Sequence, residues 1–338
     1  MLKSLASKLL TLALAATLLV AAQTPVQAAK SLIIATATTG GTYYPVGVAI
    51  GTLISVKLAS SDGITATAIN SAGSGENVQM LKNNECDLAI LQGLYGAEAY
   101  HGKGSYAGDP MQKMAGITML WQNVEHFALL SKYAKTGTAA DLKGLNEKFS
   151  IGKRGSGTEG SGRVILGALG IEPDKDFTTE YLGYNPSVDA MQDGRIAGGN
   201  IPAGVPVSAI TQMYAMLGDK GTVLDFTDEQ LAAINGDVEL WTRFVIPPDT
   251  YPGQKKPINT IAQPNLLVAS SELDEETVYK ITKTIYENLP FLNNIHGATK
   301  AMALEKAIGG MPMPLHPGAV KYYQEAGVKI PEKLLPKK

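Results

Sequence analysis

The chain has 338 residues, which is long for one domain and fits two lobes of roughly 100–200 residues each. Hydrophobic residues make up 45% of the chain and charged residues 18%, so intrinsic disorder is excluded as its main state. The formal net charge of −2 provides no strong field for holding nucleic acid or an anionic membrane. A single cysteine excludes an internal disulfide, and the four histidines are too scattered for a helix-borne metal pair, so we expect no metal.

The first residues of the chain have the pattern of an export signal. Lys3 and Lys8 precede an almost continuous apolar run at 9–22, and small residues stand at the cleavage positions up to Ala28. The alternative is a membrane anchor, but the apolar run is short for a span of about 20 residues. We therefore expect a signal peptide at 1–28, cleaved near Ala28, and a protein exported to the periplasm.

The remaining chain alternates between strand-like and helix-like runs, which predicts an α/β fold with largely parallel sheets. In chain order we expect a strand at 32–37, a helix at 44–58, a strand at 64–69, a helix at 75–82, strands at 88–92, 128–131 and 149–152, a helix at 158–169, a strand at 178–182, helices at 187–192 and 205–217, a strand at 266–269 and a helix at 275–289.

Small, polar or glycine-rich loops precede five of the expected helices. In parallel sheets such loops lie at the carboxyl ends of the strands, where free backbone N–H groups and positive helix ends bind anions. One loop of this kind would be an ordinary connection, but five favour a bound anionic or zwitterionic small molecule. The loops are at 38–43, 70–74, 155–158, 184–187 and 202–204.

One of these loops also permits an enzymatic interpretation. Residues 155–160 match the G-x-G-x-x-G pattern, and Glu180 follows at the distance of a ribose-binding acid. An exported NAD-dependent oxidoreductase is therefore the alternative function. The match lies in the middle of the chain, and nicotinamide cofactors are scarce outside the cytoplasm. The chain has no G-x-S-x-G motif, and no histidine lies in a recognisable nucleophile pattern, so we expect a protein that is not an enzyme and has no cofactor.

Two motifs near the ends of the mature chain carry a family resemblance. The sequence from Ala37 to Gly47 reads ATTGGTYYPVG, and that from Gly310 to Ala319 reads GMPMPLHPGA. With the segments at 70–78 and 181–194, these motifs resemble the TAXI family, the periplasmic solute-binding subunits of tripartite ATP-independent periplasmic (TRAP) transporters.

The resemblance implies a two-lobed periplasmic binding protein of the type II-like class, with two mainly parallel sheets flanked by helices and joined by two crossing strands. Lobe I would comprise 29–127 plus 258–338, lobe II would comprise 128–257, and the strands at 128–131 and 266–269 would make the crossings. The solute would be glutamate, glutamine or a related dicarboxylate, delivered by a monomer to sodium-driven TRAP membrane subunits. No nucleic acid partner is expected. The stretch at 195–202 departs from the family pattern, which leaves the solute open.

The resemblance also assigns ligand-binding residues in the loops of both lobes. Arg154 could contact a carboxylate or be a solvated surface charge, Asn77 could serve only its helix cap, and Trp121 and Trp241 could line the cleft or the core. The expected ligand-binding residues are Gly41, Thr42, Tyr43, Ser71, Ser74, Asn77, Gln92, Arg154, Ser156, Gly157, Thr158 and Asn185.

Overall fold

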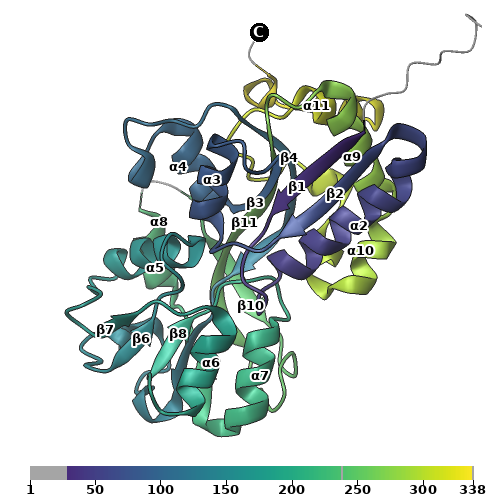
Figure 1. Cartoon of the computed structure of the whole chain (residues 1–338). Helices are drawn as coiled ribbons and strands as arrows, with labels where there is room; N and C mark the ends of the chain where they lie inside the picture. The colour runs from purple at the N-terminus through teal and green to yellow at the C-terminus, as the bar shows by residue number, and fades with distance from the viewer. Residues whose placement is uncertain (1–28, 237–238, 337–338) are drawn as a thin grey trace, which may run out of the picture.

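Two β-sheets organise the chain, one above the other in Figure 1. The computed structural model describes residues 29–236 and 239–336, and the expected signal peptide at 1–28 lies outside the described residues. The first sheet has the strand order β10-β11-β3-β1-β2, with β4 also paired to β11, and the second has the order β7-β6-β8-β5-β9.

The first sheet and its helices come from both ends of the described chain. Its strands are β1 (Lys30–Ala35), β2 (Ile64–Ile69), β3 (Leu88–Gln92), β4 (Met114–Val124), β10 (Thr242–Ile246) and β11 (Ile258–Ser270). The helices packed around it are α2 (Tyr43–Asp62), α3 (Ser74–Lys82), α4 (Gly93–His101), α9 (Glu275–Glu287), α10 (Leu289–Ile295) and α11 (Pro317–Glu325).

The second sheet comes from the middle of the chain and is smaller. Its strands are β5 (Phe127–Leu130), β6 (Lys148–Ser150), β7 (Thr178–Glu180), β8 (Gly198–Asn200) and β9 (Gly221–Val223). Its helices are α5 (Gly157–Ala168), α6 (Tyr184–Gln192), α7 (Ser208–Leu217) and α8 (Asp228–Asn235).

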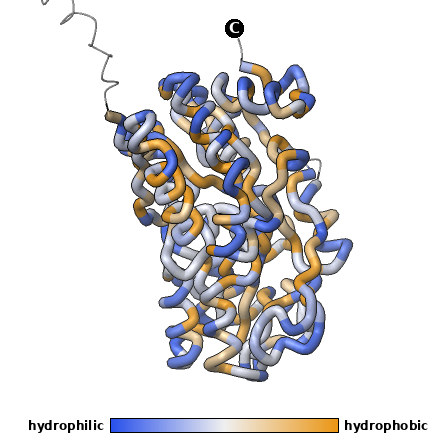
Figure 2. Tube along the Cα trace, turned by 90° about the vertical axis from the view of Figure 1, so that its right-hand side faces the viewer, coloured by the Kyte–Doolittle hydropathy of each residue, from blue (hydrophilic) through white to orange (hydrophobic). Residues whose placement is uncertain are grey.

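Hydrophobic side chains fill the space between each sheet and its helices. All five residues of β3 are buried, as expected of a short apolar run in the middle of a sheet. Helix α2 is long and apolar enough to cross a membrane by length and composition, but Val46, Ile50 and Ile54 are fully buried in the core of the first sheet. Figure 2 shows the same distribution, with hydrophobic segments inside and hydrophilic turns at the periphery.

The expected α/β architecture with two sheets is present, but each sheet is mixed rather than mainly parallel. In the first sheet β1 pairs in parallel with β2 and β3, and β3 then pairs antiparallel with β11. In the second sheet β6 pairs in parallel with β7 and β8, and β8 pairs antiparallel with β5. Each sheet therefore has a trio of parallel strands whose carboxyl ends share one edge.

Two connections join the sheets, and both differ from the expectation. Strand β4 runs through Glu125 and His126 directly into β5, so the chain crosses just before the expected segment at 128–131. That segment is not itself a crossing, because β5 pairs with β8 and β9 inside the second sheet. The segment Leu266–Ala269 is not a crossing, because it pairs with β3 inside the first sheet. Each sheet with its helices is called a body below. The start of β11 contacts the second body, because the Phe226 amide donates to the Asn259 carbonyl at 2.7 Å.

The lobe boundaries at 127/128 and 257/258 remain a prediction. Strand β10, which the predicted boundary assigns to lobe II, is hydrogen-bonded to β11 in the first sheet. The sequence of β10 does not indicate this pairing, because the alternation of apolar residues in a strand does not show which other strand it pairs with.

Candidate ligand-binding cleft

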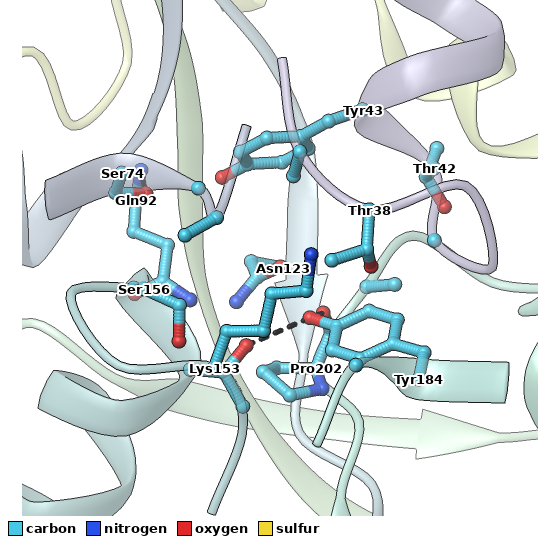
Figure 3. A pocket seen from close by; sticks show the side chains of 18 residues that line it. Thr38, Thr42, Tyr43, Ser74, Gln92, Asn123, Lys153, Ser156, Tyr184 and Pro202 are labelled. Carbon is cyan, nitrogen blue, oxygen red and sulfur yellow. Dashed lines mark hydrogen bonds between the residues drawn. The ribbon is translucent and has the colours of Figure 1, made fainter. Parts of the chain in front are cut away.

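A small cavity lies between the two sheets, at the edge where the parallel strands of both end (Figure 3). Its volume is about 30 Å³, enough for one or two water molecules. The wall from the first body comprises Ala37, Thr38, Gly41, Thr42, Tyr43, Ala72, Gly73, Ser74, Gln92 and Asn123. The wall from the second comprises Lys153, Ser156, Gly157, Thr158, Gly183, Tyr184, Pro202 and Ala203.

Direct contacts between the two walls hold the cavity closed. The Thr42 hydroxyl donates to the Gly204 carbonyl at 2.9 Å, and the Tyr95 hydroxyl donates to the Ser156 carbonyl at 3.1 Å. The Glu76 amide donates to the Gly155 carbonyl at 3.0 Å. These bonds connect residues far apart in sequence, so the two bodies are in direct contact around the cavity.

Glycines allow this close approach. A Cβ atom at Gly75 would lie 2.3 Å from the Gly155 carbonyl oxygen, and one at Gly160 would lie 2.1 Å from the Tyr95 hydroxyl. A Cβ atom at Gly157 would lie 2.7 Å from Ser74 Oγ. Any side chain at these positions would push the two walls apart.

Buried polar atoms of the cavity wall have no hydrogen-bond partner in the described chain. They are Gln92 Oε1, Asn123 Nδ2 and Thr38 Oγ1. Gln92 is 3% exposed and Asn123 is 1% exposed. An unpaired buried polar group costs free energy comparable to a lost hydrogen bond, so these atoms are suited to binding a polar ligand.

One basic side chain reaches into the cavity. Figure 3 shows Lys153 extending from the loop before α5 toward Tyr43 and Asn123. Lys153 is solvent-exposed in part, and it forms no ion pair with another residue of 29–236 or 239–336. Its ammonium group is therefore available to a ligand.

Four helices begin at the cavity wall, namely α2, α3, α5 and α6. The N-terminus of a helix carries partial positive charge and unpaired N–H groups. At α5 the Ser156 hydroxyl accepts from the Glu159 amide at 3.0 Å, and the Glu159 carboxylate accepts from the Gly155 amide at 2.8 Å. These bonds fix the shape of the loop, and the first residues of α5, Gly157 and Thr158, line the cavity.

The structure brings eight of the twelve expected ligand-binding residues to the cavity wall. Several of their hydroxyls already bind protein groups: Tyr43 donates to Asn265, and Thr158 lies 2.9 Å from the Tyr184 hydroxyl, which donates to Pro202. Whether these residues bind a ligand remains a prediction. The eight are Gly41, Thr42, Tyr43, Ser74, Gln92, Ser156, Gly157 and Thr158.

The other four expected residues lie outside the wall. Ser71 Oγ lies 2.6 Å from Asn77 Oδ1, and Asn77 Nδ2 donates to the Thr36 and Ile90 carbonyls, so this pair ties β1 to β3. Asn185 packs against Gly40, whose Cβ would lie 2.1 Å from Asn185 Oδ1.

Arg154 also lies outside, because its guanidinium stacks on the Tyr181 ring at 3.6 Å from the ring centroid. Trp121 and Trp241, which could have lined the cleft, are buried in the hydrophobic clusters of the first and second body.

Sequence reasoning missed ten residues of the wall, of which four have polar side chains, namely Thr38, Asn123, Lys153 and Tyr184. Thr38 and Tyr184 lie inside two of the expected loops, so the loop signal had located them. Asn123 had no signal, because β4 was not expected as a strand. Lys153 and Arg154 are adjacent basic residues before Gly155. Only the directions of their side chains in the structure show that Lys153, and not Arg154, lines the cavity.

The G-x-G-x-x-G loop does not have the surroundings of a dinucleotide site. Its last glycine, Gly160, packs against Tyr95 of the first body, and the Gly155 carbonyl is bonded to α3. Glu180, the expected ribose-binding acid, pairs with Lys148 at 2.9 Å. In this conformation the loop is covered by Tyr95 and by the start of α3.

Two buried titratable groups occupy the connection between β4 and β5. The Glu125 carboxylate oxygen Oε2 accepts from Asn200 Nδ2 at 3.1 Å, and burial raises the pKa of Glu125 to about 8. The His126 ring lies 2.9 Å from the Val124 carbonyl and 2.8 Å from the Tyr251 hydroxyl, and burial lowers the pKa of His126 to about 4. Both side chains are therefore uncharged at neutral pH in the folded protein.

The Glu125 carboxyl should make stability depend on pH. Between pH 4.5 and about 8 the unfolded chain loses this proton while the folded chain keeps it, so stability falls by about 1.4 kcal/mol per pH unit. We expect Glu125→Gln to gain stability relative to the wild type over this window, as measured by urea unfolding at pH 5, 6, 7 and 8. His126 is present in both proteins and cancels in the difference. A difference that does not change with pH would contradict the raised pKa.

The sequence matches the NMT1-like family over residues 34–327. Among solved structures, MatC from Rhodopseudomonas palustris with bound malate is 14% identical, with a TM-score of 0.52, and the match covers 92% of this chain and 97% of that one. A binding protein component of an ABC phosphonate transporter from Pseudomonas aeruginosa is 10% identical, with a TM-score of 0.51 and coverages of 80% and 79%.

A third similar structure is PhnD1 from Prochlorococcus marinus in complex with methylphosphonate. It is 14% identical, with a TM-score of 0.50, and the match covers 80% of this chain and 91% of that one. At these identities the likeness shows the fold alone. It confirms the expected two-sheet α/β fold of a periplasmic binding protein.

Proposed function

Because the chain belongs to the NMT1-like family, we propose that it is a periplasmic solute-binding protein that captures a small carboxylate between its two sheets. The observation that carries the proposal is the closed cavity itself. It combines the Lys153 ammonium, the unpartnered amides of Gln92 and Asn123 and the N-termini of four helices. Such a combination suits an oxyanion.

We further propose that the chain is a TAXI-type binding protein, as the motifs at 37–47 and 310–319 suggest. We propose that residues 1–28 direct export and are cleaved near Ala28, and that the protein then delivers its solute to sodium-driven TRAP membrane subunits. The candidate solutes are glutamate, glutamine and related dicarboxylates. MatC and PhnD1, which have the same fold, bind malate and methylphosphonate, and both solutes are small oxyanions.

Binding would proceed by closure of two lobes around the solute. Lobe I would comprise 29–127 plus 258–338 and lobe II 128–257, with Glu125 and His126 at one connection between them. The contacts between the two walls, such as that of Thr42 with Gly204, belong to the closed state and would break on opening. A ligand that contacts both walls shifts the population toward closure.

A screen of small carboxylates tests the proposal. The protein is unfolded and refolded to remove any bound solute, and its thermal unfolding is then followed with each compound. A ligand at 100 times its Kd adds about 2.7 kcal/mol of apparent stability, so the cognate solute should raise the Tm by several degrees. The same compound should reduce the radius of gyration in small-angle scattering. No stabilisation by any small carboxylate would refute the proposal.

A further inference from the structure

The charge of the cavity wall has one sign. Among the described residues that form the wall, Lys153 is the only one with a charged side chain, and none is an acid. The backbone adds positive potential from both bodies, through the N-termini of α2, α3, α5 and α6. The first-turn carboxylates of Glu76 and Glu159 accept from the Ala72 and Gly155 amides and offset part of this potential at α3 and α5, but neither carboxylate lines the cavity. A cationic group on a ligand would therefore find no acidic side chain in the wall to pair with.

The unpartnered polar atoms of the wall are also poorly suited to binding an ammonium group. Asn123 Nδ2 and the Lys153 ammonium can only donate hydrogen bonds, and so can an ammonium group on a ligand. The buried acceptors without a partner are Gln92 Oε1 and the Thr38 hydroxyl, and both are neutral. Neutral acceptors do not offset the cost of removing an ammonium group from water beside another ammonium.

The buried carboxyl group of Glu125 lies close to the cavity but adds little negative charge to it. Glu125 follows Asn123 by two residues but does not line the cavity. Its carboxyl oxygen Oε2 accepts from Asn200, and Oε1 is buried without a partner among the described residues. Burial raises its pKa to about 8, so it is largely protonated at neutral pH. In the ligand-free protein it therefore contributes little negative charge to the site.

We propose that the ligand of this site is a short-chain organic acid without an ammonium group, that is, an oxo, hydroxy or unsubstituted carboxylate and not an α-amino acid. This inference rests on the proposed function and narrows it, since it selects the carboxylates over glutamate and glutamine. The Lys153 ammonium and Asn123 Nδ2 would bind the anionic head, and the rings of Tyr43 and Tyr184 would face the carbon chain.

Matched pairs of acids test the proposal, because the members of each pair differ only at one substituent. The pairs are 2-oxoglutarate with glutamate, malate with aspartate, and pyruvate with alanine. Calorimetric titration of the refolded, solute-free protein at pH 7 should show the member without an ammonium group binding roughly tenfold or more tightly in the pair of the correct chain length. Tighter or equal binding of the amino acid would overturn the inference and leave the proposed function intact.

The variant Glu125→Gln tests whether the Glu125 carboxylate pairs with the ammonium group of an amino acid ligand. In Glu125→Gln the preference for the member without an ammonium group should be unchanged, since Glu125 is neutral and outside the wall. If instead the wild type binds the amino acid and Glu125→Gln abolishes that binding, Glu125 is the counter-ion and the inference fails. If no acid of any pair binds and the wider carboxylate screen is also negative, the proposed function fails with it.

Discussion

Replacing Lys153 by methionine should weaken ligand binding by about 10- to 150-fold. A hydrogen bond to a charged group contributes about 1.5–3 kcal/mol, which corresponds to that change in Kd. Methionine keeps most of the side-chain length, so the variant removes the ammonium while leaving the shape of the wall. Calorimetric titration with the solute found by the screen measures the effect.

Arg154→Gln is the matched control for Lys153→Met. It removes the same charge from the adjacent residue, whose guanidinium stacks on Tyr181 outside the cavity. We expect its affinity to stay within about twofold to threefold of the wild type, since a charge screened by solvent contributes little. If Arg154→Gln loses as much affinity as Lys153→Met, the effect comes from the general field and Lys153 is not a direct ligand. If neither variant loses affinity, the anion is bound elsewhere.

Replacing Gly157 by alanine should disfavour the closed state. Its Cβ atom would lie 2.7 Å from Ser74 Oγ and 2.8 Å from Gln92 Oε1, both on the opposite wall. Overpacking of this kind costs about 1–3 kcal/mol, and here the cost falls on closure because the open form separates the two walls. We expect roughly 5- to 150-fold weaker binding. Scattering should show the decrease in the radius of gyration only at correspondingly higher solute concentration.

Gly167→Ala in the same helix provides the comparison. Gly167 is exposed, and a Cβ atom added there would have no neighbouring atom within 4 Å. Alanine there should stabilise the fold by up to about 1 kcal/mol and leave affinity unchanged, because it removes only the backbone entropy of glycine. Equal affinities of Gly157→Ala and the wild type would show that the walls do not meet at this point in the bound protein.

The sequence alone was sufficient for the repeated strand–loop–helix organisation. The runs at 64–69 and 88–92 became strands with those bounds. The first alternates apolar residues with threonines, as in a half-buried strand, and the second is an apolar run that is buried throughout. The polar loops at 38–43 and 155–158 then had to lie at strand ends, before helix N-termini. Eight expected residues reached the cavity wall for this reason.

Only the tertiary structure decided which side chains in those loops face the cavity. Lys153 and Arg154 are adjacent and chemically similar, yet one reaches into the cavity and the other stacks on Tyr181. Asn123 faces the cavity because β4 pairs with β11, a strand that comes much later in the chain. Such pairing depends on contacts between distant segments, which local periodicity does not encode. The position of Lys153 as the one charged side chain among the described residues of the wall follows from this arrangement.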